Sequence, residues 1–558
     1  MDSYVRGDSE TALIEDTIGA VFDRAVARWP EREALVAVEQ DIRWTFAEFG
    51  RRVDDLAAGL LARGLQRGDR VGIWAPNLAE WTVTQFATAK AGLIQVNINP
   101  AYRLSELEFT LNKVGVKALI VAERFKTSDY VAMVEALAPE IASAGATPGA
   151  LEARALPHLK LVVKIGGPPR PGWLDFGDIA ASDRARLTAA AAQLDARHAI
   201  NIQFTSGTTG LPKGATLSHR NLVNNAFFVG RAAGLRGGDR LAAPVPLYHC
   251  FGMVMANLAC VIHGATIVYP AAGFDALAVL TTVAREKCTV LYGVPTMFIA
   301  ELEHENFDDF DLTSLRAGIM AGSPCPIEIM RRVIDRMHMR DVTIAYGMTE
   351  TSPVSFQSSP DDPMERRVTT VGRIQPHMEA KVIDADGATV PRGVTGEICT
   401  RGYAVMLGYW DDAEKTAQAV DAEGWMHTGD LAVIDEEGYG NIVGRSKDMI
   451  IRGGENIYPR EIEEFLFTMP GIGDVAIVGV PDEKYGEAVC AWVKVRAGHT
   501  LTEADVQGFC RDRIAHYKAP RYVVFVDEFP VTVTGKVQKF LIRKRMIETL
   551  GLREQKTA

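Results

Sequence analysis

The sequence has few of the residues that hold disulfide-rich or metal-stabilised proteins together. Seven cysteines are spread over 558 residues, an odd number without a C-x-x-C pair, and the eleven histidines are scattered. These features exclude a disulfide framework and argue against a zinc site or a histidine metal cluster. They indicate a protein of a reducing compartment.

Basic residues are also fewer than acidic ones. The chain has 60 Lys and Arg residues against 71 Asp and Glu residues, which gives a formal net charge of −11 at pH 7. This balance argues against nucleic-acid binding as the main function, because such surfaces carry an excess of cations. A local basic patch around a polyphosphate ligand is still compatible with it.

Long apolar runs are missing as well. The N-terminal stretch MDSYVRGDSETALIED is acidic and has no apolar signal core. The most apolar stretch, Met253–Tyr269, is interrupted by Asn257, His263 and Gly264, whereas a transmembrane span needs ~20 apolar residues. We therefore expect a buried helix that ends near His263, a strand over 265–269, no transmembrane segment and a cytoplasmic location. A peripheral membrane contact is still compatible with the sequence.

Predicted strands and helices alternate along the first part of the chain. Strands are expected over 70–74, 92–97 and 118–121, with helices over 80–91 and 105–113 between them. This β-α-β-α-β order is typical of a parallel sheet that is covered by helices.

The pattern changes in two places farther along. A Pro- and Gly-rich surface loop is expected over 166–172, and the alternation resumes from 199 to about 345. From Gly372 short strands and glycine turns indicate a small β-rich subdomain, and the C-terminal part indicates a separate α+β unit. The short strands are expected over 380–384, 396–400, 432–435 and 441–443, and the final unit has expected helices over 459–467 and 503–514 and strands over 475–480 and 488–495. The predicted fold class is therefore α/β, with a large N-terminal domain of stacked α/β sheets, the β-rich subdomain, and a small α+β C-terminal domain.

One loop is dense in residue types that bind phosphate. The stretch FTSGTTGLPKGA, Phe204–Ala215, follows an expected strand over 199–204 and precedes an expected helix with Ser218 as its N-cap. Its glycines let backbone N–H groups approach an anion, and its hydroxyls and lysine add donors and charge. It is not a Walker loop, which requires G-x-x-x-x-G-K-[ST]. Taken alone, the loop fits either a phosphate cradle or an ordinary flexible turn.

Five further segments favour the phosphate cradle. They are MAGSPCP (320–326), AYGMTETSP (345–353), GWMHTGD (424–430), GRSKDMIIRGGENIYPREIE (444–463) and PVTVTGKVQK (530–539). In order and spacing, these segments and the loop resemble the adenylate-forming superfamily, which contains acyl- and aryl-CoA synthetases, firefly luciferase and the adenylation domains of peptide synthetases. The resemblance covers essentially the whole chain. TSGTTGxPKGATLSH, PLYHC, YGxTExSPV, GYxVMLGYW and GRSKDMIIRGGENIYP are most similar to medium-chain fatty-acyl-CoA synthetases.

The resemblance implies a two-step reaction at one site. A carboxylic acid attacks the α-phosphate of ATP to give an acyl-adenylate and pyrophosphate, and the thiol of coenzyme A then takes the acyl group and releases AMP. The first step requires that like charges are neutralised and that the attacking and leaving oxygens lie in line. The residues implied to hold the β- and γ-phosphates are Thr205, Ser206, Gly207, Thr208, Thr209, Gly210, Leu211, Pro212 and Lys213.

Further site residues follow from the same resemblance. Glu350 is expected to bind Mg²⁺, a hard cation that prefers oxygen ligands, and Thr349 to donate to the α-phosphate. Lys536 is expected to bridge the substrate carboxylate and the α-phosphate. Asp430 is expected to accept both ribose hydroxyls, with Arg445 beside the ribose or the α-phosphate. The implied adenine walls are Tyr346 on one side and Gly322, Ser323 and Pro324 on the other. The structural alternatives are a solvated charge for Glu350 or Lys536, a helix cap for Asp430 and core packing for Tyr346.

The resemblance also implies that the C-terminal domain is mobile. Residues 1–446 would form the N-terminal domain, and 447–558 would rotate about a hinge near Lys447. One face of the rotating domain would bring Lys536 for the first step, and the opposite face would line a tunnel for the pantetheine arm. The implied tunnel residues are Arg452, Gly453, Gly454 and Glu455. The cations expected on a solvated helix face near the end are Lys539, Arg543, Lys544 and Arg545.

The acyl pocket is less well defined by the sequence. Gly252, Ala256 and Ala259 fall on one face of an expected helix over 251–262. Small side chains there leave room either for an alkyl chain or for close helix packing. His249 precedes this helix, at a place where the family often has an aromatic or histidine gate.

We expect an ATP-dependent fatty acid–CoA ligase for medium-chain acids. An aryl acid–CoA ligase and adenylating enzymes that do not use coenzyme A, such as a fatty-acyl-AMP ligase, are the alternatives. An inactive binding protein is disfavoured, because Lys213, Glu350, Asp430, Arg445 and Lys536 occur together. The expected partners are the acid, ATP and coenzyme A, without nucleic acid, and a homodimer is left open.

Overall fold

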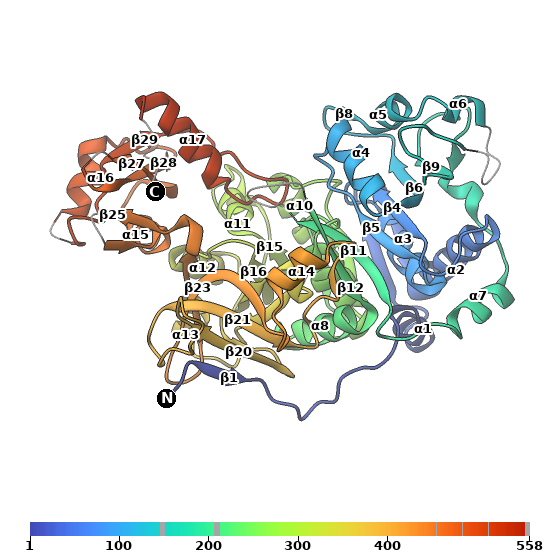
Figure 1. The fold of residues 1–558 in the computed structure, drawn as a ribbon, viewed down its shortest axis with the longest axis horizontal. Helices are drawn as coiled ribbons and strands as arrows, with labels where there is room; N and C mark the ends of the chain where they lie inside the picture. Colours follow the sequence, from blue (N-terminus) through green and yellow to red (C-terminus); the bar gives the residue numbers. More distant parts are fainter. Residues whose placement is uncertain (145–150, 206–211, 453–454, 483, 512, 553–558) are drawn as a thin grey trace.

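Figure 1 shows the computed structural model of the chain, in which three large sheets and a small hairpin of β7 (Arg124–Phe125) and β8 (Ser128–Asp129) precede a C-terminal α+β unit. The residues described are 1–144, 151–205, 212–452, 455–482, 484–511 and 513–552. Within these ranges no helix has both the length and the apolar character that crossing a membrane requires.

The first sheet contains the alternating elements predicted near the N-terminus. β4 (Arg70–Trp74), β5 (Ile94–Asn97) and β6 (Val116–Ala122) are parallel neighbours. α3 (Ala79–Ala91) and α4 (Leu104–Lys113) connect them, so this part of the prediction is confirmed. The strand order is β10 (Leu174–Asp175), β9 (Leu161–Ile165), β6, β4, β5, β11 (Ala199–Thr205), β12 (Lys213–Ser218) and β22 (Gly408–Tyr409).

The helix α3 fills the space between the first and the second sheet. It contacts β4 and β5 of the first sheet and β2 (Glu33–Ala37) of the second, as well as α1 (Ile18–Arg28) and α2 (Phe46–Ala62). Nearly every residue of α3 is buried, including Trp81 and Phe86. A helix that is buried on all sides needs a covering layer on each side, and the two sheets provide it.

The second sheet places the ends of its parallel strands along one edge. β15 (Val290–Gly293), β16 (Ala317–Ala321) and β17 (Asp341–Gly347) run parallel to one another. In sheets of this kind ligands bind beyond the carboxyl ends of the strands. The complete order is β19 (Arg373–Ile374), β18 (Val354–Gln357), β17, β16, β15, β13 (Arg240–Ala242), β14 (Thr266–Tyr269), β2 and β3 (Ile42–Thr45).

The predicted β-rich subdomain is an antiparallel sheet. Its order is β1 (Tyr4–Arg6), β20 (Met378–Ile383), β21 (Gly396–Gly402), β23 (Met426–Ile434) and β24 (Gly440–Arg445). β1 was not predicted; it pairs with β20, which lies more than 370 residues farther along the chain. A three-residue strand is too short to show an alternating pattern, and its partner is far away along the chain.

The C-terminal α+β unit has the predicted elements, with one shorter helix. α15 (Pro459–Phe467) packs on β27 (Ile472–Asp482), which pairs with β28 (Gly486–Val495). α16 (Glu503–Cys510) ends four residues before the predicted 514. The other elements of this unit are β25 (Ile450–Arg452), β26 (Glu455–Ile457), β29 (Tyr522–Phe525) and α17 (Lys539–Leu550).

Of the four cations predicted on a solvated face of the last helix, Lys544 and Arg545 are exposed, whereas Lys539 and Arg543 are half-buried and paired. Lys539 forms an ion pair with Glu463 at 2.6 Å, and Arg543 forms one with Glu487 at 2.9 Å. α17 packs against β27, so these cations reach acidic residues of the C-terminal unit. Sequence alone could not place those partners opposite them.

The segment after the phosphate loop also differs from the prediction. Lys213–Ser218 forms strand β12, which pairs antiparallel with β11, so the loop joins two strands rather than a strand and a helix. The helix α8 (His219–Ala232) follows directly, and Ser218 caps it as predicted, by accepting a hydrogen bond from Asn221 N. The backbone hydrogen bonds of 213–218 are therefore satisfied by β11, which local sequence does not reveal.

The apolar helix predicted over 251–262 consists of two successive helices of different type. Phe251–Leu258 is a π-helix and Ala259–His263 is the α-helix α9, which ends at Gly264 in a left-handed conformation, φ 69°. The predicted end at His263 and the following strand β14 are confirmed. π-Helical segments are rare and occur frequently at functional sites. The remaining helices are α5 (Tyr130–Leu137), α6 (Ile141–Ala144), α7 (Arg184–Ala191), α10 (Ala276–Glu286), α11 (Pro295–Leu302), α12 (Ile327–Arg336), α13 (Met364–Thr369) and α14 (Ala413–Ala419).

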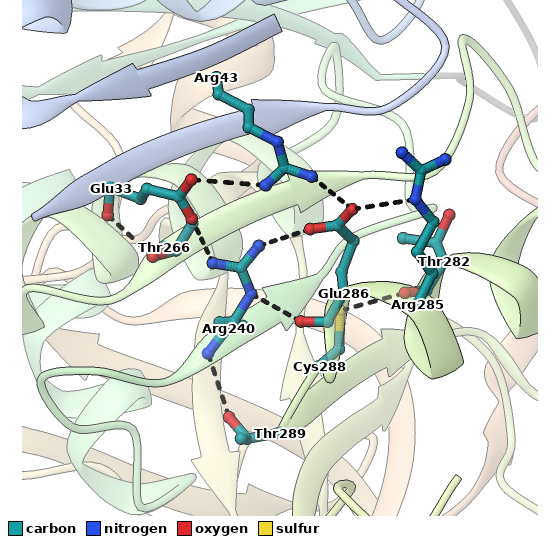
Figure 2. Close-up of polar contacts among 9 residues, drawn as sticks. All are labelled: Glu33, Arg43, Arg240, Thr266, Thr282, Arg285, Glu286, Cys288 and Thr289. Carbon is teal, nitrogen blue, oxygen red and sulfur yellow. Dashed lines mark hydrogen bonds and ion pairs between the residues drawn. The ribbon is translucent and has the colours of Figure 1, made fainter. Parts of the chain in front are cut away.

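A cluster of charges ties the β2–β3 hairpin, at the end of the second sheet, to β13 and α10 (Figure 2). The Glu286 carboxylate, at the C-terminal end of α10, accepts hydrogen bonds from Arg43 at 2.6 Å and Arg240 at 2.8 Å. Glu33 of β2 bonds to both arginines. Burial raises the pKa of Glu286, but the bonds to Arg43 and Arg240 outweigh this and leave the pKa below its usual value. A glutamate at a helix C-terminus is unfavourable by itself, so the two arginines stabilise it there.

We expect Glu286→Gln to lower the melting temperature. Its side chain is 5% exposed, and removing one partner from a buried ion pair costs about 3 kcal/mol. Because the folded-state pKa is lowered, this stabilisation is present above the unfolded-state pKa and is lost as pH falls through the folded-state value. Thermal melts at pH 7 and near pH 4 should show a large deficit at pH 7 and a smaller one in acid.

Glu365→Gln is the matched control, since Glu365 pairs with Arg331 on the surface at 3.4 Å. Such exposed pairs contribute about 0–1 kcal/mol. Equal melting temperatures for the two variants at pH 7 would show that the cluster does not fasten the hairpin.

Candidate functional site

The predicted adenine walls lie at the carboxyl edge of the second sheet. Ala321 pairs with Ala345, so the loop that begins at Gly322 is next to Tyr346 on the neighbouring strand. Gly322 has φ 91°, and a Cβ there would lie 3.1 Å from Val294 Cγ1. The turn that carries Ser323 and Pro324 therefore needs glycine both for its backbone conformation and for its close approach to the end of β15.

Asp430 lies where three segments meet. Its Oδ2 accepts a hydrogen bond from Tyr346 Oη at 2.7 Å, and its Oδ1 lies 3.2 Å from Arg445 Nε. Asp430 and Arg445 are also paired residues on β23 and β24. Burial and the neighbouring Asp430 raise the pKa of Tyr346 well above its usual value. Both carboxylate oxygens that were predicted to accept ribose hydroxyls are thus held by a phenol and a guanidinium.

Glu350 lies on a second side of the site, beside the phosphate loop. Its Oε1 accepts hydrogen bonds from Tyr409 Oη at 2.8 Å and from Thr205 Oγ1 at 3.3 Å. The Lys213 ammonium lies 4.7 Å from the centre of the Tyr409 ring. The two ends of the loop and the predicted magnesium ligand are therefore together, although Ser206, Gly207, Thr208, Thr209, Gly210 and Leu211 lie outside the described residues.

Tyr409 was not singled out by sequence analysis, although it lies in the quoted motif GYxVMLGYW. It comes close to Glu350 because β22 pairs with β12, with Tyr409 opposite Ala215. A signal was present, since a tyrosine within a shared motif is a candidate for a polar contact. Only the pairing of distant strands shows which residue it contacts.

The buried carboxylate of Glu350 fits a magnesium ligand. Within the described part of the chain, its Oε2 has no hydrogen-bond or ion-pair partner, and the side chain is buried beside two hydroxyl groups. Mg²⁺ is usually bound by one or two carboxylates together with substrate phosphates and waters. Thr349 precedes Glu350 in the short helix Thr349–Thr351 and is also buried.

Lys536 enters the site from the C-terminal unit. It lies in a tight turn in which Thr532 N donates to Lys536 O at 2.8 Å and Lys536 N donates to Thr532 Oγ1 at 3.1 Å. Gly535 O accepts a hydrogen bond from Thr296 Oγ1 at 3.2 Å. Thr296 belongs to α11, directly after β15, so the turn rests against the edge of the second sheet that carries Tyr346 and Gly322.

The charge of Lys536 interacts both with the Asp430–Arg445 pair and with His249. Burial and the positive charge of Arg445 lower the pKa of Lys536 to about 8, with Asp430 and Asp448 acting in the opposite direction. The charge of Lys536 in turn contributes, after burial, to lowering the pKa of His249 to about 4. Lys536 is thus within electrostatic reach of the Asp430–Arg445 pair and of the predicted acyl gate.

His249 is neutral at physiological pH because of that lowered pKa. Its Nδ1 accepts a hydrogen bond from Phe251 N at 3.2 Å, at the start of the π-helix, so Nε2 carries the proton. A neutral imidazole with an Nε2–H group can donate to a carboxylate. This arrangement is compatible with the predicted gate, which stays a prediction.

Of the three small residues on one face of the helix predicted over 251–262, Gly252 and Ala259 pack against neighbouring segments of the chain. A Cβ at Gly252 would lie 2.5 Å from Pro246 O, and a Cβ at Gly230 of α8 would lie 3.5 Å from the Ala259 Cβ. Gly252 and Ala259 therefore allow close approach of neighbouring backbone, as in the packing alternative. Ala256 is fully buried in the π-helix between them.

A row of buried amides supports the π-helix and was missed by sequence analysis. Gln95, Asn97, Asn201 and Gln203 are linked by hydrogen bonds of 2.8 to 3.0 Å across β5 and β11. Asn97 Nδ2 donates to Tyr248 O at 2.9 Å. The signal was the alternation Gln-x-Asn and Asn-x-Gln in two predicted strands, which puts all four side chains on one face.

The hinge and tunnel residues lie around the start of the C-terminal unit. Lys447 is in the short helix Ser446–Asp448, where burial and then Arg445 lower its pKa. Arg452 pairs with Glu455 across β25 and β26 and donates to Tyr517 O at 2.6 Å. Gly453 and Gly454 lie outside the described residues.

Comparison with known proteins gives similarity over the whole chain. The sequence matches the AMP-binding enzyme family over residues 22–410 and the AMP-binding enzyme C-terminal domain over residues 461–536. It is 47% identical to the medium-chain acyl-CoA ligase ACSF2, mitochondrial, of Danio rerio, over 99% of this chain and 91% of that protein. It is 46% identical to the putative acyl-CoA synthetase YngI of Bacillus subtilis (strain 168), over 97% of this chain and 99% of that protein.

A solved structure shares the fold as well. The anthranilate CoA ligase AuaEII, in complex with anthranoyl-AMP, superposes with a TM-score of 0.85 at 28% sequence identity. The similarity covers 98% of this chain and 99% of that chain. The large N-terminal part and the small C-terminal part therefore both have counterparts in a known enzyme structure.

The contact between Gly535 and the second sheet can be tested by a single methyl group. Gly535 has φ 77°, and a Cβ there would lie 2.9 Å from both Thr296 Oγ1 and Val294 Cγ2. We expect Gly535→Ala to displace the Lys536 turn and to slow acyl-adenylate formation at least about tenfold, which corresponds to about 1.4 kcal/mol in the barrier. Pyrophosphate release in the absence of coenzyme A measures this step.

Gly498→Ala is the matched control. Gly498 has φ 80° in the same C-terminal unit, but nothing lies within 4 Å of its added Cβ. Both variants carry the same backbone strain, so only the contact differs. Similar rates for the two variants would contradict the role of this contact.

Proposed function

The chain belongs to the AMP-binding enzyme family and is an AMP-forming acid–CoA ligase, and we propose that its acid is a medium-chain fatty acid. The observation that supports this choice is the 47% identity to a medium-chain acyl-CoA ligase over 99% of the chain. ATP and coenzyme A are its co-substrates. The relation to an anthranilate CoA ligase is more distant, at 28% identity, so an aryl acid is the weaker candidate.

In the proposed first step, the Lys536 ammonium bridges the acid and the α-phosphate. The incoming carboxylate and the phosphate repel each other, and a cation between them lowers this repulsion as negative charge develops in the transition state. His249, neutral and protonated on Nε2, donates to the carboxylate without adding a second charge. Lys213 and the rest of the 205–213 loop hold the β- and γ-phosphates until pyrophosphate leaves.

In this proposal the nucleoside is bound by Asp430 and its two partners, Tyr346 and Arg445. The ribose hydroxyls take the place of the Tyr346 hydroxyl or the Arg445 guanidinium on the Asp430 carboxylate, and Arg445 turns toward the α-phosphate. The Tyr346 ring and the turn of Gly322, Ser323 and Pro324 enclose the adenine, and Thr349 donates to the α-phosphate. Asp430 thus exchanges partners within the protein for partners on the substrate, which requires little reorganisation.

Glu350 would hold the magnesium ion through Oε2, while Tyr409 and Thr205 fix its Oε1. Bound magnesium neutralises charge on the phosphate oxygens. The two hydroxyl groups orient the carboxylate before ATP arrives, which lowers the conformational cost of binding.

The second step requires a different position of the C-terminal unit. We propose that residues 447–558 rotate about Lys447 relative to residues 1–446, which withdraws Lys536 and brings Arg452, Gly453, Gly454 and Glu455 to the site. The thiol of coenzyme A then attacks the acyl carbonyl and AMP leaves. A cytoplasmic location and a homodimer stay proposals from the sequence.

Lys536→Ala should separate the two half-reactions. We expect acyl-adenylate formation to be lost, and thioester formation from supplied acyl-adenylate and coenzyme A to persist. In the unsubstituted enzyme, kcat/KM for the first step should fall as pH rises through about 8, because the charged form of Lys536 is lost. Lys536→Arg stays charged and should lack this decline. Equal loss of both half-reactions in a folded Lys536→Ala protein would rule out the two-position mechanism.

A panel of acids tests the proposed substrate. Coenzyme A-dependent AMP release should rise along the straight-chain acids to an optimum between about six and twelve carbons, about fourfold per methylene, because each buried CH₂ contributes about 0.8 kcal/mol. Benzoate and anthranilate should react more slowly. Best activity on acetate or on an aromatic acid would refute the proposal.

A matched pair of variants locates the pocket. Ala256→Val should shift the optimum to a shorter acid if Ala256 faces the alkyl chain. Ala259→Val adds the same volume to the face that packs on Gly230, so it should lower stability without moving the optimum. An unchanged optimum in both folded variants would place the acyl pocket elsewhere.

A further inference from the structure

A cluster of three potential metal ligands lies on β21 and β23, apart from Glu350. Cys399 and His427 are opposite each other in the register of these strands, and Glu397 is two residues before Cys399 on the same face. Their ligand atoms all lie within 4.8 Å of one another. The sequence argued against a zinc site, because the members of this cluster come from strands that are separated by about 25 residues and have no short-range spacing motif.

Two of the three separations match the coordination sphere of one ion, and the third, between Cys399 and Glu397, is within 4.8 Å. The Cys399 Sγ and the His427 Nδ1 are 3.6 Å apart, and the His427 Nδ1 and the Glu397 Oε2 are also 3.6 Å apart. Zinc binds sulfur at about 2.3 Å and nitrogen or oxygen at about 2.0–2.2 Å in a tetrahedron, so its ligand atoms lie roughly 3.3–3.6 Å from one another. An ion therefore fits with only small side-chain movements.

In Glu397 and His427, the side-chain atom that does not face the cluster has a partner of its own. This partner holds the other atom, Glu397 Oε2 or His427 Nδ1, toward the cluster. The Glu397 Oε1 accepts a hydrogen bond from Gly429 N at 2.9 Å, which leaves Oε2 toward the histidine. The His427 Nε2 lies 3.5 Å from Asp421 Oδ2, and Asp421 Oδ1 accepts from Trp425 N at 2.9 Å. A carboxylate behind the far nitrogen of a metal-binding histidine fixes its tautomer and orientation.

The surrounding charge also favours a cation. Glu397 and Asp421 bring two carboxylates, whereas Lys381, opposite Cys399 on β20, is drawn over the Trp425 ring at 4.5 Å. Cys399 is fully buried, and His427 and Glu397 are each about one-third exposed. An ion could enter from the exposed side, with water as its fourth ligand. A sulfur ligand selects zinc and similar borderline ions over magnesium.

We propose that Glu397, Cys399 and His427 form a zinc-binding site that stabilises the strand pair carrying Asp430. The pairing of β21 with β23 is irregular between Glu397 and Cys399, and the residues on the other side of this irregularity are Thr428, Gly429 and Asp430. Such bulges direct a side chain and locally weaken pairing. An ion that joins both strands around the bulge would hold the Asp430 carboxylate in place. The proposal does not depend on which acid the enzyme uses.

Cobalt substitution tests the site directly on the full-length protein. After treatment with a chelator, we expect one equivalent of Co²⁺ to bind with the visible bands of a tetrahedral ion and a near-ultraviolet band of thiolate-to-cobalt charge transfer. One equivalent of Zn²⁺ should remove both, and Mg²⁺ should not. Cobalt at Glu350 would have oxygen ligands and would give no thiolate band, so the two sites are distinguishable.

Variants assign the ligands. Cys399→Ser should abolish the thiolate band, and His427→Gln and Glu397→Gln should each weaken Zn²⁺ binding in equilibrium dialysis. Asp421→Asn should weaken it about tenfold while retaining the band, as expected for an orienting partner. Cys510→Ser, in the C-terminal unit, is the control and should change neither measurement.

Hydrogen exchange tests the link to Asp430. Zinc should slow exchange at the amides of Gly429 and Asp430 in the unsubstituted protein, and should have no effect in His427→Gln. Absence of a thiolate band, or an unchanged band in folded Cys399→Ser, would overturn the site. Zinc binding without slower exchange would overturn its proposed role in holding the strand pair.

Discussion

The contact on which the site depends is the Asp430 carboxylate held between Tyr346 and Arg445. It joins the carboxyl edge of the second sheet to the antiparallel sheet, and it partly offsets the positive charge that surrounds Lys536. Without that carboxylate, the charges of Arg445 and Lys536 would repel each other with no negative charge between them. The Asp430 carboxylate thus allows Arg445 and Lys536 to lie close together before any phosphate is bound. The pKa of Lys536 is nevertheless lowered, because burial and Arg445 outweigh the effect of Asp430.

The small C-terminal unit contacts the large part at several places, and the turn that contains Gly535 is the contact that carries Lys536. Lys536 is within electrostatic reach of both Asp430 and His249, which lie on different elements of the large part. The turn with Gly535 rests on Thr296 with one hydrogen bond. This hydrogen bond and the close approach of Gly535 to Val294 position Lys536 at the edge of the second sheet.

Much of the fold could be predicted because the local patterns were strong. The parallel strands β4, β5 and β6 and the helix α15 follow directly from apolar periodicity and turn residues. The strand β12 and the π-helix after Cys250 were not predicted, because their conformations depend on partners outside the segment. β12 takes its hydrogen bonds from β11, and the π-helix lies over a row of buried amides from two other strands.

By itself the sequence determined the family, the order of the elements and the residue types at the nucleotide end of the site, because those are carried by contiguous motifs. Only the tertiary structure decided which groups meet: Tyr409 with Glu350, Tyr346 with Asp430, and Cys399 with His427. Each of these pairs joins elements that are separated along the chain, by 28 to 84 residues. Their register is set by the pairing of whole sheets, which no short stretch of sequence contains.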